Sequence, residues 1–103
     1  MAKVAVVAKI MAQDGRRDEV LAVLRRIVEA ADEEPGTEVY AVNTQDDEPN
    51  VIWIYELYAD QAARESHGAS ETMKQVGAAV RELAAAPAQI LALSPVSAVG
   101  LTL

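Results

Sequence analysis

The chain has 103 residues, with nine Lys and Arg against sixteen Asp and Glu, which gives a net charge of −7 at pH 7. This length predicts a single domain over residues 1–103. The acidic balance argues against binding to nucleic acid or anionic lipid, which requires clustered Lys and Arg. The chain contains no Cys and one His, which excludes disulfide scaffolds, thiol nucleophiles, structural zinc and multi-histidine metal sites. No apolar run is long enough to span a bilayer, and no signal-peptide cleavage pattern is present, so we expect a cytoplasmic protein.

The first quarter of the chain predicts a strand followed by a helix. Residues 3–11 are short and rich in Val and Ile, as in a β-strand. Over residues 16 to about 33, apolar side chains recur at three- and four-residue steps, which is typical of an amphipathic helix. Asp14 is the expected N-cap of this helix, and Pro35-Gly36 is its expected stop.

The middle of the chain predicts a β-hairpin. Residues 37–45 and 51–59 both have the composition of strands, and the second contains the run VIWIY. Residues 46–50 (DDEPN) have the composition of a turn. Two strands joined by so short a segment are expected to pair antiparallel.

The last third predicts two further helical stretches and a fourth strand. Asp60 is the expected cap of a short helix that ends near His67, and Ser70 is the expected cap of the next helix. Pro87 ends that helix, and residues 88–96 are predicted as a strand.

The resulting order, β-α-β-β-α-β, predicts an α+β, ferredoxin-like fold with a four-stranded antiparallel sheet and the helices on one face. The other face of such a sheet normally alternates toward polar residues. Here the segments VIWIY, VAVVA and ILAL are apolar on both faces. We therefore expect a homodimer in which two sheets pack face to face. The apolar tail, residues 97–103, is a candidate to cross to the partner.

These segments resemble the antibiotic-biosynthesis monooxygenase family, a branch of the dimeric α/β-barrel superfamily. The resemblance is carried by Glu34, Gly36 and Tyr40 in an E-x-G-x-x-x-Y pattern, by the IYELY run of the third strand, and by residues 66–70 with a His-x-x-Ser pattern. It implies small dimeric enzymes that oxygenate phenolic or quinol-type substrates without flavin, haem or metal. The same fold also hosts isomerases, decarboxylases and proteins without demonstrated chemistry.

The chain departs from its relatives at several positions. Many relatives carry Trp where Tyr58 stands and a second His where Thr72 stands. Haem-degrading relatives need a helical Trp and a haem-ligating His where this chain has His67 and Gly77. We therefore expect no haem, and we expect any imidazole chemistry to rest on His67 alone.

His67 and Glu56 are the candidate catalytic residues. His67 is the one side chain whose ordinary pKa lies near neutrality, so it is the natural proton handler; the alternative is a local helix-end contact. Glu56 lies in an otherwise apolar strand. It either faces the space between sheet and helices, where burial would raise its pKa, or is paired at the dimer seam.

Tyr58, Tyr40 and Trp53 are the candidate substrate-binding residues, with core or interface packing as the alternative for each. Strand alternation places Glu56 on the same face as Tyr58, whereas Trp53 points the opposite way unless a bulge intervenes. Arg64 and Lys74 either meet an acidic substrate group or lie on solvated helix faces, and the acidic runs at 32–34 and 46–48 are expected to be solvated rather than to bind a cation.

The sequence thus favours a cofactor-independent monooxygenase that acts with O₂ on a small phenol, naphthol or anthrone. His67 would be the base or a relay, and Glu56 and Tyr58 would orient it or the substrate oxygen. Two alternatives remain open. One is an isomerase or other proton-transfer enzyme with the same residues, and the other is a non-enzymatic dimer that binds a small ligand.

Overall fold

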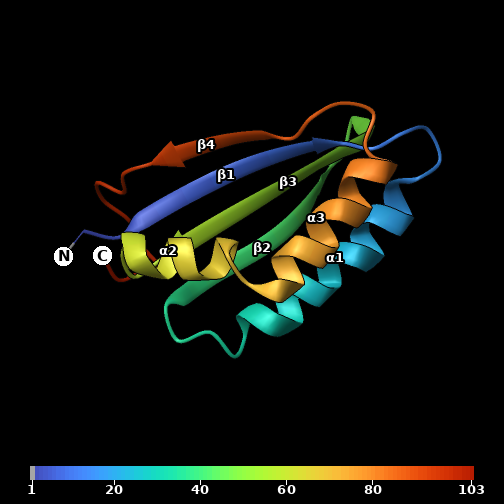
Figure 1. Cartoon of the computed structure of the whole chain (residues 1–103). Coiled ribbons are helices and arrows are strands. Elements are labelled where there is room, and N and C mark those ends of the chain that lie inside the picture. The colour runs from blue at the N-terminus through green and yellow to red at the C-terminus, as the bar shows by residue number, and fades with distance from the viewer. Residues whose placement is uncertain (1) are drawn as a thin grey trace.

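The fold is a four-stranded antiparallel sheet with every helix on one face, as predicted (Figure 1). A computed structural model describes residues 2–103. The elements in chain order are β1 (Val4–Met11), α1 (Arg17–Ala31), β2 (Thr37–Gln45), β3 (Glu48–Tyr58), α2 (Gln61–Gly68), α3 (Glu71–Leu83) and β4 (Gln89–Leu93). The strand order is β2-β3-β1-β4. None of the helices formed by residues 2–103 has the length and apolar character that a membrane crossing requires.

Two of the three predicted helix caps are confirmed. The Asp60 carboxylate accepts a hydrogen bond from the backbone N–H of Ala63 at 2.8 Å, at the start of α2. The Ser70 hydroxyl accepts one from the backbone N–H of Met73 at 3.2 Å, at the start of α3. Each cap satisfies a backbone donor that the first helical turn leaves free.

The predicted cap of α1 is wrong. Arg16 occupies the N-cap position without a side-chain cap, and Asp14 lies in the preceding turn. The Asp14 carboxylate instead accepts a hydrogen bond from Asn50 Nδ2 at 2.6 Å. Gly15 follows with a φ of +77°, the left-handed conformation that glycine adopts without strain. This turn is therefore tied to β3 rather than to the helix that it introduces.

The strand boundaries also differ from the composition-based prediction. β3 begins at Glu48, so the turn of the hairpin is residues 46–47 rather than 46–50. Pro49 is accommodated because β1 pairs with β3 only from Val51 onward, so no ladder donor is required of Pro49 on that side. β4 covers five residues, which pair with β1, and is shorter than the predicted 88–96.

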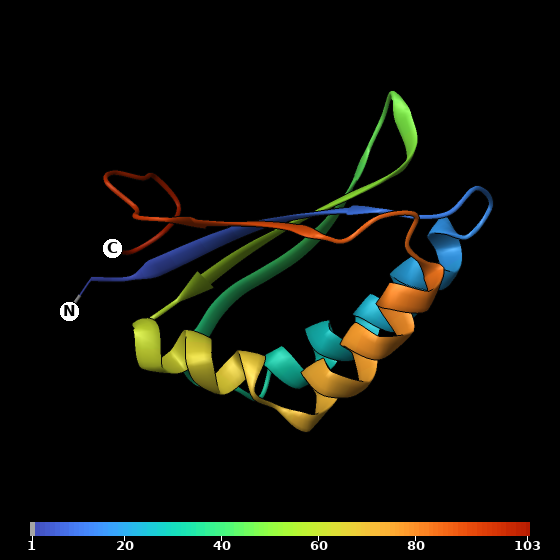
Figure 2. The ribbon, with the colours of Figure 1, turned by 45° about the horizontal axis from the view of Figure 1, so that its top comes forward.

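The helices cover one face of the sheet and leave the other face free of helices (Figure 2). Along β3, Ile52 and Ile54 belong to the core beneath the helices, whereas Trp53 and Tyr55 alternate to the outer face. The core cluster consists of Ala8, Ile10, Ala12, Val20, Leu24, Ile27, Ile52, Ile54, Val76 and Leu83.

Candidate active site

A cavity of about 800 Å³ lies between the sheet and the helices. Its wall is formed by residues of β1, α1, β2, β3 and α3, by Gly68 at the end of α2, by the segment 84–88 and by Ile90 of β4. Most of the wall is apolar. The exceptions among its side chains are Tyr40 and Glu56 from the sheet and two cations from α3. A cavity of this size and composition is suited to an aromatic ligand of more than one ring.

Glu56 is the carboxyl group in the cavity wall. The register of the β2–β3 ladder pairs Glu56 with Tyr40, so the two side chains project from neighbouring strands on the same face. The hydroxyl of Tyr58, two residues along the same strand, donates a hydrogen bond to Glu56 Oε1. Burial raises the pKa of Glu56, although the Tyr58 hydrogen bond and the nearby His67 and Arg64 oppose this effect.

The two tyrosines respond to the same surroundings. Burial raises the pKa of Tyr40 and of Tyr58, and the Glu56 carboxylate raises both further because it disfavours a second negative charge nearby. Both hydroxyls therefore keep their protons across the physiological range. They are available as hydrogen-bond donors, and one of them, that of Tyr58, is already committed to Glu56.

His67 is held by Glu34. Its Nδ1 lies 2.7 Å from Glu34 Oε1, and the Thr37 hydroxyl donates to the same oxygen at 2.8 Å. An ionised carboxylate only accepts hydrogen bonds, so the network assigns the ring proton to Nδ1. In the neutral ring Nε2 then carries the free lone pair. This atom is buried and has no hydrogen-bond partner within residues 2–103.

The His67 ring is enclosed by two tyrosine rings. Its centroid lies 5.4 Å from that of Tyr40 and 5.4 Å from that of Tyr58, with both pairs tilted. His67 is 4% exposed and Tyr58 is 1% exposed. Because Tyr40 and Glu56 line the cavity while His67 and Tyr58 do not, the imidazole lies one layer behind the cavity wall.

The structure thus gathers four of the predicted site residues, Glu56, Tyr58, Tyr40 and His67, and leaves Trp53 apart. Trp53 lies on the outer face of the sheet, where its Nε1 donates to Gln45 Oε1 at 2.7 Å. Lys9 Nζ lies 5.4 Å from the centroid of the Trp53 ring on the same face. Within one protomer, Trp53 has no access to the cavity, because the sheet itself intervenes.

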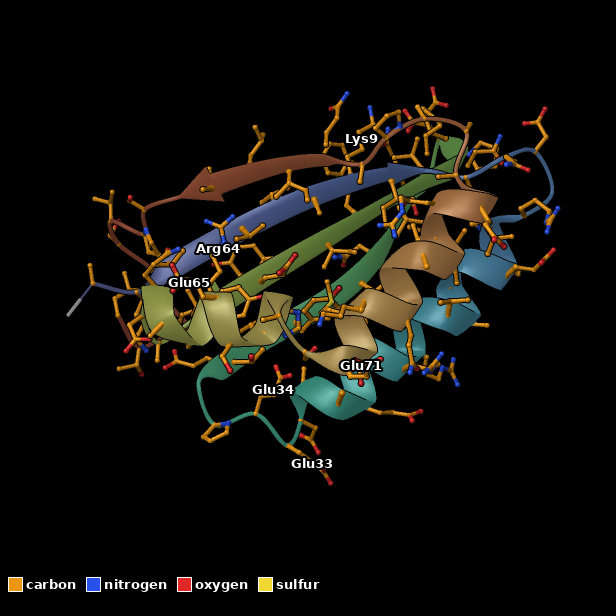
Figure 3. All side chains as sticks on the ribbon, viewed as in Figure 1. Lys9, Glu33, Glu34, Arg64, Glu65 and Glu71 are labelled. Atoms are coloured by element: carbon orange, nitrogen blue, oxygen red, sulfur yellow. The ribbon has the colours of Figure 1, made fainter. Side chains whose placement is uncertain are left out.

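Glu34 is the site residue that the sequence reasoning missed, because the acidic run 32–34 was expected to be solvated. Figure 3 shows Glu34 on the segment that leaves α1, below α2. This segment lies close against α2, since a Cβ at Gly36 would be only 2.5 Å from Ala63 Cβ of that helix. The E-x-G-x-x-x-Y pattern was the one feature of the sequence that pointed to Glu34. Its Gly permits the approach that lets its Glu reach His67.

Some of the charged residues on the helices line the cavity and others do not. Lys74 lines the cavity together with Arg81, which the sequence reasoning did not single out. Arg64, on α2 (Figure 3), does not line it, although its positive charge lowers the pKa of Glu56. Within the part of the chain that the structure describes, no three acidic or imidazole side chains gather as ligands for a metal ion.

Comparison with known proteins places this geometry in context. The family model described as antibiotic biosynthesis monooxygenase matches residues 3–79. The structure of Rv0793 from Mycobacterium tuberculosis is 25% identical in sequence, with a TM-score of 0.88 over 94% of this chain and 98% of that one. A Caulobacter crescentus protein named as a candidate antibiotic biosynthesis monooxygenase is 29% identical, with a TM-score of 0.88 over 93% and 92% of the two chains. PA3566 from Pseudomonas aeruginosa shares the fold, with 21% identity and a TM-score of 0.86 over 94% and 97%. No curated protein matches the sequence.

Proposed function

Since the chain belongs to the antibiotic biosynthesis monooxygenase family, we propose that it oxygenates an electron-rich aromatic compound of the phenol, naphthol or anthrone type in this cavity. For an anthrone, the ring CH₂ becomes C=O, one oxygen atom of O₂ enters the product, and the other leaves as water with the two hydrogens. The substrate supplies all four electrons. The proposed reaction therefore needs no flavin, haem or metal as reductant.

The observation that carries the proposal is the Glu56 carboxyl in the wall of an apolar cavity, with a raised pKa. A carboxylate whose pKa is moved toward neutrality is a better general base at physiological pH than an ordinary one. We propose that Glu56 removes a proton from the substrate, since the deprotonated aromatic can itself transfer electrons to O₂. The Tyr58 hydrogen bond fixes the orientation of the carboxyl.

His67 supports this step from behind the wall. Glu34 fixes its Nδ1–H, so the free lone pair of Nε2 is on the side of the ring away from Glu34. We assign to His67 the role of a relay that receives the proton from Glu56. Of the two roles that the sequence left open for His67, base or relay, we choose the relay, because Tyr40 and Glu56 line the cavity and His67 does not.

The apolar wall favours a polycyclic substrate over a single-ring phenol. A cavity of about 800 Å³ falls within the range of about 300–1,000 Å³ that is typical of drug-sized ligands. A phenol would leave most of it filled with water. A bound ring system of two or three rings would exclude that water and protect the reactive carbanion from protonation.

We further propose that the protein works as a cytoplasmic homodimer, with the outer faces of two sheets packed together. The outer face carries Trp53 and Tyr55, and on β4 it carries Leu91 and Leu93, which are 61% and 44% exposed. The C-terminal segment adds Val99, which is fully exposed. Apolar surface of this kind is stabilised by burial against a second copy.

A proton-transfer enzyme such as an isomerase is the second candidate, because the same raised pKa of Glu56 serves a reaction that consumes no oxygen. Oxygen uptake separates the two. With a panel of naphthols and anthrones, we expect wild-type protein to consume one O₂ per quinone formed. Rearranged product without oxygen uptake would support the isomerase instead.

The residue assignments are tested in the same assay. We expect Glu56→Gln and His67→Ala each to lower turnover by roughly 10²–10⁴-fold, the usual contribution of a general base. Glu65→Gln, which alters an exposed carboxyl on α2, is the matched control and should leave turnover unchanged. Full activity in both site variants would refute the assignment of an acid–base pair.

If wild-type protein neither consumes oxygen nor rearranges any member of the panel but binds it in the cavity, the third possibility, a ligand-binding dimer, is supported.

A further inference from the structure

Two cations of α3, Lys74 and Arg81, line the cavity at its exposed side. The chain as a whole is acidic, with a net charge of −7. Nevertheless, Glu56 is the one acidic side chain in the cavity wall, and both other charged side chains there are cationic. The cavity therefore has a neutral, apolar middle, a carboxyl group on the sheet side and positive charge on the helix side.

The spacing of these residues places them on one side of the helix. Lys74, Gly77 and Arg81 follow each other at three- and four-residue steps, and all three line the cavity. Arg81 Nη1 lies 3.4 Å from the position that a Cβ at Gly77 would occupy. The guanidinium therefore lies back over Gly77, toward the start of the helix, as long side chains on helices normally do. The missing side chain at Gly77 leaves room for it against the cavity wall.

Neither cation is engaged by another residue of the described chain. The ion pairs within residues 2–103 involve Lys3, Arg16, Arg17 and His67, and they include neither Lys74 nor Arg81. On the neighbouring helix α1, by contrast, Arg26 donates a hydrogen bond to Gln75 Oε1 at 2.6 Å. The donors of Arg81 and Lys74 are thus free to bind a ligand that occupies the cavity.

We propose that the ligand of this cavity is an aromatic carboxylate, with its acidic group held by Arg81 and Lys74 and its hydroxylated ring directed toward Glu56. The planar guanidinium matches a carboxylate with two parallel N–H donors, and a charge-assisted pair of this kind is stronger than a neutral hydrogen bond. Placing the anion at the exposed side avoids the cost of burying it, and it keeps the anion away from the Glu56 carboxylate.

This inference deepens the proposed function by naming the substrate class, but it concerns binding and is measurable without turnover. The probes are 6-hydroxy-2-naphthoate and its neutral counterpart, 6-hydroxy-2-naphthamide, titrated into the full chain by calorimetry. We expect the acid to bind about tenfold more tightly than the amide, because one charge-assisted pair distinguishes them. We also expect added salt to weaken binding of the acid but not of the amide.

The variants assign that preference to residues. Arg81→Gln should abolish the preference for the acid, and Lys74→Gln should reduce it. Arg25→Gln removes an exposed cation of α1 that does not line the cavity, so it should leave the preference intact. Circular dichroism of each variant checks that the exposed substitution has not altered the fold.

The outcomes separate this inference from the oxygenase proposal. If Glu56→Gln protein keeps the preference for the acid and wild-type protein consumes no oxygen, the binding inference holds and the oxygenase proposal fails. If wild-type protein oxidises neutral naphthols but shows no preference for the acid, the binding inference fails alone. A preference that survives Arg81→Gln, or no binding of either probe, also overturns it.

Discussion

The two faces of the sheet are built from the same strands but have different polar chemistry. On the helix side, Glu56 in the cavity wall is hydrogen-bonded to Tyr58, whose ring contacts the ring of His67 behind the wall. On the outer side, Trp53 bonds to Gln45 and lies near Lys9, in small local pairs. Side chains alternate along β3, so consecutive residues of this one strand lie on opposite faces of the sheet.

An apolar run such as VIWIY supplies side chains to both faces of the sheet. Residues of one parity on β3 contribute to the core and the site. Of the other parity, Trp53 and Tyr55 are partly exposed on a surface that we assign to the partner, whereas Val51 and Leu57 are buried within the chain. The helix side completes its core within one chain. The outer side has no helix over it (Figure 2). Substitutions at neighbouring positions of β3 should therefore have different consequences.

The largest effect is expected on the helix side, for Ile54→Glu. Ile54 is 3% exposed and belongs to the core cluster. A glutamate there would bury a charge without a partner, on the same face as Glu56. We expect a loss of about 3–5 kcal/mol in the free energy of unfolding. Urea denaturation followed by circular dichroism measures this, and a variant as stable as wild type would contradict the placement of the core.

The adjacent substitution Tyr55→Glu should act on assembly instead. Tyr55 is partly exposed on the outer face, so a glutamate there remains hydrated in one protomer but becomes buried between two sheets. We expect the dimer dissociation constant to rise by about 100-fold or more, with the helical signal retained. Sedimentation velocity reports the change. A folded wild-type monomer at micromolar concentration would remove the basis of this expectation.

Features that depend only on neighbouring residues could be predicted from the sequence alone. Alternation along β3 sufficed to separate Glu56 and Tyr58 from Trp53, because side-chain direction in a strand is a local property. The caps at Asp60 and Ser70 were equally local, since each donor lies three residues beyond its acceptor.

Features that depend on distant partners could not be predicted in this way. Asp14 has the composition of a cap, yet its carboxylate is bound by Asn50, 36 positions away. Glu34 has the appearance of a solvated acid, yet it holds His67, 33 positions away. Asn50 is brought near Asp14 by strand β3, and His67 is brought near Glu34 by the contact between Gly36 and α2. No local pattern indicates either partner except the Gly of the family motif.

That glycine gives a third prediction, of intermediate size. A Cβ at Gly36 would meet Ala63 Cβ at 2.5 Å, and both atoms are close to rigid backbone. Gly36→Ala should therefore displace α2 and destabilise the protein by about 1–3 kcal/mol, the usual cost of overpacking. Chemical denaturation measures this loss.

The matched control is the double variant Gly36→Ala with Ala63→Gly, which moves the methyl group from one side of the contact to the other. It should recover part of the stability, less the roughly 1 kcal/mol that a glycine costs inside a helix. Equal instability of the single and double variants would show that the contact is not the cause. The same double variant should also restore turnover, if α2 positions His67 as the structure indicates.

The smallest effect concerns the pH dependence of stability and contrasts Glu56 with an exposed carboxyl. Burial raises the pKa of Glu56 above its ordinary value of 4.5. Between 4.5 and the raised value, the folded state holds a proton that the unfolded state has lost, so this group makes the protein less stable as pH rises.

Glu56→Gln removes this contribution while its amide oxygen still accepts the Tyr58 hydrogen bond. The variant should therefore gain stability relative to wild type as pH rises from 4.5, and well below 4.5 the difference should no longer change with pH. Denaturation curves between pH 4 and pH 8 test this, with Glu65→Gln on the surface of α2 as a control whose difference from wild type stays flat. If Glu56→Gln instead loses stability as pH rises, the carboxylate is stabilised in the folded state, and Glu56 is a structural anchor rather than a base with a raised pKa.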